Sequence, residues 1–388
     1  MYTIASLNIH LYLLISLDND GVLNYNITYY NTFNNYYQNS IEVILIQPFI
    51  HNTIHVKQIN TEVIKKTLKS LTSATKANLA QATGLSIATC GTILNELLTT
   101  GEVLEHEQED SHGGRPAKKF MYNAHFSYIA CIYIKAEETR HSLTYTVANS
   151  IGEYIESGHE EVSSVNATII DHLIERLIHT YGNIKAIGIG IPGVAHQGMI
   201  QICDASALIG VPLESQLNEK YGIDIIIEND MNLTAYGFYQ KQQYDQDKTI
   251  AVVTFIKGSF PGAGLMIDGH IHKGNTRFAG EISFLPFGIT REEQYTQLHQ
   301  SSTFIPLAAK MLISLIATIN PEKIALTGDQ IHSEQVKDLY NACLEYIPVE
   351  HMAELHMLKE PDQDYMHGLV SMTLESLDYA LQLVEKRR

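Results

Sequence analysis

The sequence predicts two folded domains in series, a small helical domain closed by a β-hairpin and a larger α/β domain. Three observations predict them. Helical periodicity and a Gly-Gly turn occupy residues 57–125, strand and helix signals alternate from residue 126 onward, and polar residues follow several of the later strands. A chain of 388 residues has room for two or three domains. We therefore divide the sequence into residues 1–56, 57–125 and 126–388.

The composition is that of a globular protein. Hydrophobic residues make up 45% and charged residues 18% of the chain, which is ordinary. The chain contains no run of about eighteen apolar residues, so we expect no transmembrane helix and no membrane partner. No CxxC pair occurs among the four cysteines, which argues against a zinc ribbon or a disulfide framework and indicates a reducing cytoplasm. They are Cys90, Cys131, Cys203 and Cys343.

The negative charge is unevenly distributed. The formal net charge is −17, which by itself disfavours a nucleic-acid partner. Residues 57–125 contain eight Lys and Arg against seven Asp and Glu, a net of +1, so the remainder carries −18. This segment is therefore spared the repulsion that DNA phosphates exert on the rest.

The first 56 residues contain no Lys or Arg and are dense in Asn and Tyr. The apolar run from Ile4 to Leu17 resembles the core of a secretion signal, but no basic residue precedes it and no small-residue cleavage site follows. Two interpretations stay open: an extra strand-forming element that docks on the body, or an upstream region read as coding because the start was misassigned. The lack of helical periodicity favours the second.

A helix-turn-helix pattern begins at Glu62. Apolar residues at helical spacing continue to Leu71, and a second helical segment follows after a short break. Gly84 supplies the positive φ of the tight turn behind it. Ser86 then caps a third helix, which ends at Leu98, by accepting from the free amides at its start.

The third predicted helix has one buried stripe and one outward face. The buried residues are Cys90, Ile93, Leu94 and Leu97. A recognition helix turns the outward residues of its first turns toward base edges. These are Ile87, Ala88, Thr89, Gly91 and Thr92.

A two-stranded wing follows. Residues 100–105 start one strand, Gly-Gly-Arg-Pro-Ala forms a turn, and residues 118–122 return. Arg115 on this stiff turn suits a narrow A·T-rich minor groove. Together the elements predict a winged helix-turn-helix DNA-binding domain over residues 57–125; the alternative is an ordinary hairpin with solvated basic residues.

One feature opposes tight DNA binding. No Lys or Arg lies between Lys76 and Arg115, whereas six acidic residues do. Phosphate contacts usually dominate affinity. Here they would come from the amides at the Ser86 helix start, from Ser and Thr hydroxyls, and from Arg115, Lys118 and Lys119. We expect weak binding to one site, rescued by dimerisation on two half-sites.

The larger domain alternates strand and helix signals, and such sheets hold ligands at strand ends. Predicted strands are 128–135, 142–147, 223–227, 250–255, 263–268 and 323–327, and residues 184–194 form a buried strand that runs into a Gly-Pro-Gly loop. Predicted helices are 167–181, 213–221 and 304–319.

Five motifs follow one another in a specific order. They are Gly-Gly-Arg-Pro at 113–116, Ile-Gly-Ile-Pro-Gly at 189–193, Glu-Asn-Asp-Met-Asn-Leu at 228–233, Ala-Gly-Glu-Ile at 279–282, and Pro-Glu-Lys-Ile-Ala-Leu-Thr-Gly at 321–328. In these motifs the chain resembles the ROK family (repressors, open reading frames and sugar kinases), in its xylose-repressor-like branch. The resemblance covers residues 57–388. It implies a two-lobed, actin-like fold of the ribonuclease-H-like ATPase type, a homodimer or higher homo-oligomer, and a sugar site in the cleft between the lobes.

The resemblance also implies that Gly193, Asn229, Asp230 and Glu281 contact sugar hydroxyls. An Asn and two carboxylates offer donors and acceptors for vicinal hydroxyls. In kinase members the position of Asp230 is the base that deprotonates the attacking hydroxyl. The other interpretation of Asn229 and Asp230 is a helix N-cap without a ligand, and the two roles are compatible.

The sequence departs from the family's kinases at both phosphate loops. The expected Asp-x-Gly-Gly-Thr loop corresponds to residues 134–139, with no glycine and two carboxylates, so its charge has the wrong sign for phosphate. In the second loop, residues 257–264, Phe260 and Pro261 add bulk and remove an N–H. We expect no ATP cofactor and no enzyme activity.

The family's zinc site is missing as well. Members with zinc follow Gly-Glu-Ile with a His and a Cys-rich hairpin, whereas here Phe284 stands at the His position and the next cysteine is Cys343. We expect no metal, and we expect that a helical subdomain was deleted along with the hairpin, because residues 287–304 lead almost directly to a long helix. His270 and His272 lack a third ligand and are expected to be surface residues.

These features predict a cytoplasmic DNA-binding regulator, a repressor, in which a sugar or sugar-derived effector closes the cleft and changes the spacing of two wings. Its expected partners are operator DNA, the effector and a second copy of the chain. Two alternatives stay open: an active sugar kinase that uses Asp230, and a degenerate scaffold that no longer reads DNA.

Overall fold

The computed structural model describes residues 9–17, 23–31, 53–106, 118–136 and 140–377. It divides into two compact units, residues 1–63 and 64–388. In the first unit strand β1 (Ile9–Leu17) pairs antiparallel with β2 (Leu23–Asn31). Two paired strands are what the strand-forming interpretation of this region predicts.

Helix α1 (Thr53–Leu71) is longer than predicted. The prediction that it begins at Glu62 is wrong, because no Gly or Pro between Thr53 and Glu62 ends the helix. Thr72, at φ 62°, then turns the chain. The short strand β3 (Ala74–Thr75) follows, and the Thr75 hydroxyl caps helix α2 (Lys76–Thr83) in a capping box with Asn78.

Helix α3 (Ile87–Thr100) has the predicted start and the predicted faces. Gly84 has φ 73°, and the Ser86 hydroxyl oxygen accepts from the Thr89 amide at 3.0 Å. The predicted stripe is buried, and Ile87 on the other side is 58% exposed. The turn, the cap and the stripe are therefore confirmed.

The predicted wing is part of a three-stranded sheet with the order β3-β5-β4. Strands β4 (Val103–His106) and β5 (Lys119–Tyr122) pair antiparallel, and β3 joins the far side of β5, with Ala74 opposite Phe120. The prediction of two strands is therefore incomplete. A two-residue strand carries no periodicity signal and forms only because β5 offers its free edge.

The first lobe of the larger domain contains the sheet β12-β9-β6-β7-β8. Strands β12, β9 and β6 are parallel, and β7 and β8 continue antiparallel. Helices α4 (Ala167–Tyr181) and α5 (Leu213–Tyr221) bury their apolar stripes against the sheet. The strands are β6 (Tyr128–Ala136), β7 (His141–Asn149), β8 (Tyr154–Val162), β9 (Ile184–Ile191) and β12 (Asp224–Asn229).

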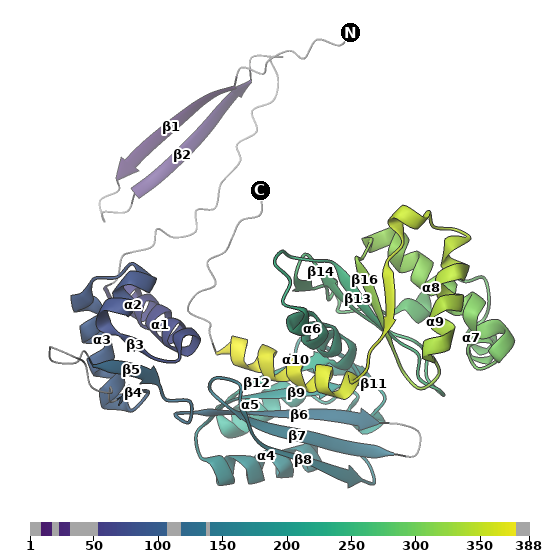
Figure 1. The fold of residues 1–388 in the computed structure, drawn as a ribbon, viewed down its shortest axis with the longest axis horizontal. Helices are drawn as coiled ribbons and strands as arrows, with labels where there is room; N and C mark the ends of the chain where they lie inside the picture. The colour runs from purple at the N-terminus through teal and green to yellow at the C-terminus, as the bar shows by residue number, and fades with distance from the viewer. Residues whose placement is uncertain (1–8, 18–22, 32–52, 107–117, 137–139, 378–388) are drawn as a thin grey trace, which may run out of the picture. The chain divides into compact units, whose positions relative to one another are not determined.

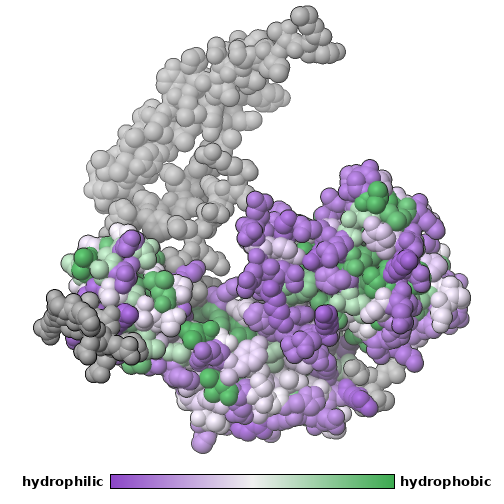
Figure 2. Space-filling model, in the orientation of Figure 1, coloured by the Kyte–Doolittle hydropathy of each residue, from purple (hydrophilic) through white to green (hydrophobic). Residues whose placement is uncertain are grey.

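The second lobe contains the sheet β15-β14-β13-β16-β17. Its strands are β13 (Ile250–Thr254), β14 (Ala263–Ile267), β15 (His270–Ile271), β16 (Lys323–Thr327) and β17 (Glu354–Met357). Helices α7 (Arg291–Leu298), α8 (Ser301–Ile319) and α9 (Ser333–Leu344) contribute to the core on one face. On the side seen in Figure 2 the surface of this lobe is mostly hydrophilic.

One detail of this lobe contradicts a prediction, and a second concerns its longest helix. Helix α7, started by a capping box between Thr290 and Glu293, occupies the segment that was expected to lead almost directly to the long helix. Helix α8 is, among the described residues, the one helix long and apolar enough to cross a membrane. Eight of its residues, Leu312 among them, are buried in the lobe, as in a core helix of a globular domain.

Helices α6 (Asp230–Gln242) and α10 (Pro361–Ser376) pack against each other between the two sheets (Figure 1). A Cβ on Gly237 would lie 1.9 Å from the Asp364 carbonyl oxygen, and one on Gly368 would lie 2.0 Å from that of Leu233. Only glycine permits this approach. Helix α6 also packs on the second sheet and α10 on the first, so this pair joins the two lobes.

Candidate functional site

Asn229 and Gly193, two of the predicted effector-binding residues, are in direct contact. Asn229 ends β12 and caps α6, with its Oδ1 accepting from the Asn232 amide at 3.0 Å. Its Nδ2 donates to the Gly193 carbonyl oxygen at 2.9 Å. The capping role proposed for Asn229 is therefore confirmed, and the side chain is held at the strand end.

Gly193 permits the close pairing of a hairpin. It begins β10 (Gly193–His196), which pairs with β11 (Met199–Cys203). A Cβ on Gly193 would lie 2.1 Å from the Ile202 carbonyl oxygen. Directly after β11 the Asp204 amide donates to the Pro192 carbonyl oxygen at 3.0 Å, so the hairpin returns an additional carboxylate to this strand end.

Asp204, Asp230 and Glu281 form a carboxylate cluster whose charges interact. Burial, reinforced by the charges of Asp204 and Glu281, raises the pKa of Asp230 to about 7 against the bond from the Met231 amide. Burial also raises the pKa of Asp204, and burial with the Asp204 charge raises that of Glu281. Asp204 was missed from the sequence; its position after a strand was the available signal.

The loop that carries Glu281 is tied to the end of β12 by a buried carboxylate. Glu228 is 3% exposed, and its Oε1 accepts from the Asn229 amide and from Asn232 Nδ2, each at 3.0 Å. Its Oε2 pairs with Lys273 and lies 3.7 Å from Arg277 Nη1. These two cations precede Glu281 on the loop, and no sequence motif had pointed to them as part of the site.

The glycine-rich loop after β13 has its amides occupied by the protein itself. The Lys257 amide donates to Asp329 Oδ1 at 2.7 Å, the Gly258 amide to His299 Nε2 at 2.7 Å, and the Ser259 amide to the Ile256 carbonyl at 3.1 Å. His299 Nδ1 lies 2.7 Å from the Tyr295 carbonyl oxygen, so that nitrogen carries the proton and Nε2 accepts. Three consecutive N–H groups therefore already have acceptors. Of the other predicted phosphate loop, residues 137–139 lie outside the described part of the chain.

The predicted DNA-contact residues are only partly within the described structure. Ser86, Ile87, Ala88 and Thr92 are exposed at the start of α3 and Thr89 is half-buried, its hydroxyl 2.8 Å from that of Ser86. Lys119 stands on β5. Lys118 Nζ is paired with Glu105 at 2.8 Å, and Arg115 lies outside the described residues.

Lys76, the first residue of α2, lies beside α3 in the structure. Its Nζ lies 3.5 Å from the position of a Cβ on Gly91, and 5.7 Å from the centre of the Phe120 ring. Packing of α2 against α3 therefore brings one positive charge beside the outward face of α3.

His270 and His272 are exposed, as predicted. Within the described ranges no group of three or more His, Cys, Asp or Glu side chains has the arrangement of a metal site.

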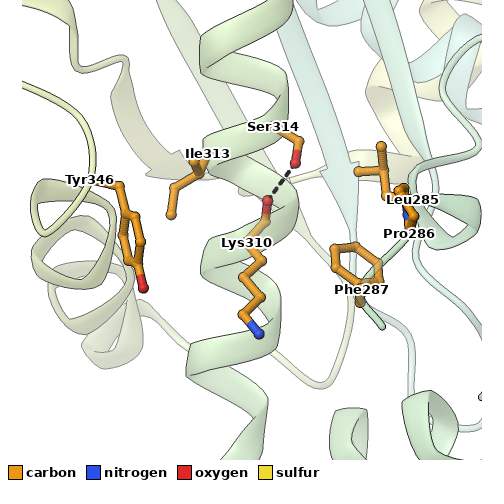
Figure 3. Close-up of a pocket in the computed structure, with 7 residues that line it drawn as sticks. All are labelled: Leu285, Pro286, Phe287, Lys310, Ile313, Ser314 and Tyr346. Carbon is orange, nitrogen blue, oxygen red and sulfur yellow. Dashed lines mark hydrogen bonds between the residues drawn. The ribbon is translucent and has the colours of Figure 1, made fainter. Parts of the chain in front are cut away.

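An apolar pocket of about 270 Å³ lies elsewhere on the second lobe (Figure 3). Lys310, Ile313 and Ser314 of α8 form one side, and residues 285–287 the opposite side, with Tyr346 at the edge. None of the predicted effector-binding residues lines it.

Two five-stranded sheets joined by a pair of packed helices, with carboxylates at strand ends, define a two-lobed α/β fold. Residues 140–295 match the ROK family model, which confirms the resemblance predicted from the motifs.

Similar proteins include regulators and kinases. The chain is 26% identical over 238 residues to the xylose repressor of Bacillus subtilis (strain 168), covering 59% of this chain and 61% of the repressor; it thus spans about three fifths of the length of this curated relative. A solved structure of a ROK family transcriptional regulator, a homolog of the E. coli MLC protein, has a TM-score of 0.61 at 18% identity, covering 82% of this chain and 97% of that one. The ROK hexokinase from Thermus thermophilus has a TM-score of 0.52 at 16% identity, covering 65% and 99%.

Proposed function

We propose that this protein is a cytoplasmic DNA-binding transcriptional regulator, a repressor of carbohydrate-utilisation genes, controlled by a sugar or sugar derivative in its larger domain. One observation carries the proposal. The hexokinase matches over nearly its whole length yet accounts for 65% of this chain, whereas the regulator accounts for 82%. The chain therefore has a folded part beyond the kinase-like body, as the regulator has.

DNA binding through a winged helix-turn-helix is the function that this additional part supports best. Helices α2 and α3 are joined by the left-handed Gly84, the hairpin β4–β5 follows them, and β3, which precedes α2, pairs with β5. The start of α3 presents Ser86, Ile87, Ala88, Thr89 and Thr92 to base edges and to a phosphate. Arg115 on the wing, Lys118 and Lys119 would add phosphate or minor-groove contacts.

DNA affinity in this proposal is modest for one domain. Lys118 is already paired with Glu105, and an exposed pair of this kind is worth no more than about 1 kcal/mol, so a phosphate can replace the carboxylate. Lys76 beside Gly91 adds a further positive charge. A homodimer on two half-sites would supply the remaining affinity.

The effector site of this proposal is the carboxylate cluster with Asn229 and Gly193. Asp204 and Asp230 belong to elements of the first lobe and of the helix pair, whereas Glu281 follows the second sheet. A sugar that bonds to all of them binds the closed arrangement better than the open one, and this difference is what can change DNA affinity.

A second candidate is an active sugar kinase. The pKa of Asp230, raised to about 7 by burial and by its acidic neighbours, favours it, because a general base works best near the ambient pH. The loop around Gly258 opposes it, since its amides already donate within the protein. A coupled assay with sugars and MgATP separates the candidates: turnover would establish the kinase.

The proposal is tested by a gel-shift titration of the purified protein against the flanking DNA of its own gene, with and without a panel of monosaccharides. A specific shift that one sugar relieves or strengthens is expected. The absence of a shift at low salt, with every sugar, would leave the scaffold alternative and make the winged domain a remnant.

A further inference from the structure

Two exposed phenylalanines flank Glu281 of the carboxylate cluster. Phe278 precedes it and Phe284 follows it, and their ring centres lie 5.1 Å apart in an edge contact. Phe278 is 43% and Phe284 56% exposed. A pair of aromatic rings kept in contact with water beside a group of hydrogen-bonding carboxylates is a feature of binding surfaces.

Arg291 holds Phe284 in this exposed position. Its guanidinium carbon lies 4.5 Å from the centre of the Phe284 ring and 3.6 Å from that of Phe260, so the cation is held between the two rings. Arg291 Nη1 also donates to the Ser283 carbonyl oxygen at 2.6 Å and to Gln294 Oε1 at 3.0 Å. These bonds fix the arginine, and its guanidinium covers part of the Phe284 ring.

The aromatic pair is continuous with the carboxylate cluster. The 3₁₀ turn Ile282–Phe284 follows Glu281 directly, and the Phe284 amide donates to the Glu281 carbonyl oxygen at 3.0 Å. The charge of Arg291 also acts on Glu281, which interacts with Asp204 and Asp230. One side chain, Arg291, therefore has the Phe284 ring as one neighbour and the Glu281 charge as another. A ligand that bonds to the cluster through hydroxyls reaches an apolar ring surface directly beside it.

We propose that Phe278 and Phe284 form a second sugar subsite, so that the effector is a disaccharide or a longer oligosaccharide. The first ring bonds to the carboxylate cluster, and the second lays its apolar C–H face on Phe284. A sugar ring presents hydroxyls at its edge and C–H groups on its faces, which matches acceptors on one side and aromatic rings on the other. The inference rests on the proposed effector function of the cluster.

The test is isothermal titration of the full-length protein with matched sugars: xylose and xylobiose, glucose and cellobiose, N-acetylglucosamine and chitobiose. In at least one pair the disaccharide is expected to bind about tenfold tighter, which corresponds to one aromatic stacking contact. Phe284→Ala removes this advantage and leaves the monosaccharide affinity unchanged. Tyr346→Ala, at an aromatic residue 69% exposed at the separate pocket, is the matched control and changes neither affinity.

Each outcome decides between the proposals. Equal affinities within every pair, or a Phe284→Ala variant that weakens both sugars of a pair alike, would overturn the second subsite while sugar binding itself stands. If none of the six sugars binds, the effector function fails and the subsite with it. Thermal melting of Phe284→Ala verifies folding, which is expected to be preserved because the ring is largely exposed.

Discussion

The carboxylate cluster and the glycine-rich loop of the larger domain differ in whether their polar groups already have hydrogen-bond partners within the protein. In the carboxylate cluster three acidic side chains lie close enough for their charges to interact, and the pKa of each is raised by burial. In the glycine-rich loop the amides of Lys257, Gly258 and Ser259 all donate to acceptors of the protein. The carboxylate cluster therefore has oxygen acceptors that a ligand could use, whereas these three amides of the loop already donate within the protein.

This difference is what the proposed function expects of an effector site and of a loop that does not hold phosphate. Burial of neighbouring carboxylates costs folding free energy, and carboxylates with raised pKa values concentrate at functional sites. A loop whose amides already donate within the protein avoids the cost of unpaired donors and has fewer N–H groups to offer a phosphate. Glycines alone do not decide whether a loop can hold phosphate, because its N–H groups must also be free of partners within the protein.

The largest effect is expected for a substitution in the carboxylate cluster. Asp230→Asn removes an ionisable acceptor from the carboxylate cluster, so effector affinity should fall about 10- to 100-fold, the range for a lost bond to a charged group. DNA binding without effector should be unchanged in a gel shift. Asp224→Asn, at the exposed start of β12, is the control. Release of DNA by Asp230→Asn without any sugar would instead assign this residue a structural role at the start of α6.

The stability of the same variant relative to the wild type should depend on pH. Because the folded pKa of Asp230 is about 7 and its ordinary value is 3.8, ionisation costs the folded state stability as pH rises from 4 through 7. Asp230→Asn removes this cost. Urea unfolding should find the variant about 2 kcal/mol more stable than the wild type at pH 8 and equal to it below pH 4. This value is smaller than the full pKa shift implies, because the Asp230 side chain is only half-buried and water screens part of the effect. A difference independent of pH would contradict the raised pKa.

The next effect is expected in the glycine-rich loop, where the amides already have acceptors. His299→Ala leaves the Gly258 amide without its acceptor and should lower the free energy of unfolding by about 1 to 2 kcal/mol. MgATP should raise the melting temperature of neither wild type nor variant, since one freed amide does not rebuild a phosphate loop. His351→Ala, at an exposed histidine, controls for the loss of an imidazole. Stabilisation by MgATP in either protein would show that the loop still binds phosphate.

The smallest effect extends the comparison to the small domain. Glu105→Gln frees Lys118 from its exposed pair, so stability should change by less than about 0.5 kcal/mol. DNA binding should tighten by about two- to fivefold at low salt, and the salt dependence should steepen by roughly one counterion. Glu96→Gln, at an exposed position of α3, is the control for removing a negative charge. Equal effects of both variants would mean that net charge, and not Lys118, is responsible.

The sequence by itself determined the elements whose signals are local. The bounds of α4, α5 and β16 were predicted to the residue, and the left-handed Gly84 and the Ser86 cap were identified. Helical periodicity, caps and buried strands are encoded within a few neighbouring residues. The same is true of the motif that places Asn229 and Asp230 at the end of a strand.

Elements that depend on a neighbour were missed. Strand β8 is mostly polar, with apolar residues only at its ends, and forms because β7 offers a free edge, as β3 forms on β5. Helix α7 was missed because a deletion was expected there, although its capping box is visible in the sequence.

Tertiary structure alone decided the chemistry of the site. Asp204 acts on Asp230, Glu228 pairs with Lys273, and His299 fills the loop at Gly258. In each case the partners come from different elements, so no periodicity or spacing relates them. Whether a carboxylate keeps a raised pKa, or an amide is left free, depends on which side chains the fold brings within hydrogen-bonding distance, and that distance is fixed only when the lobes are packed.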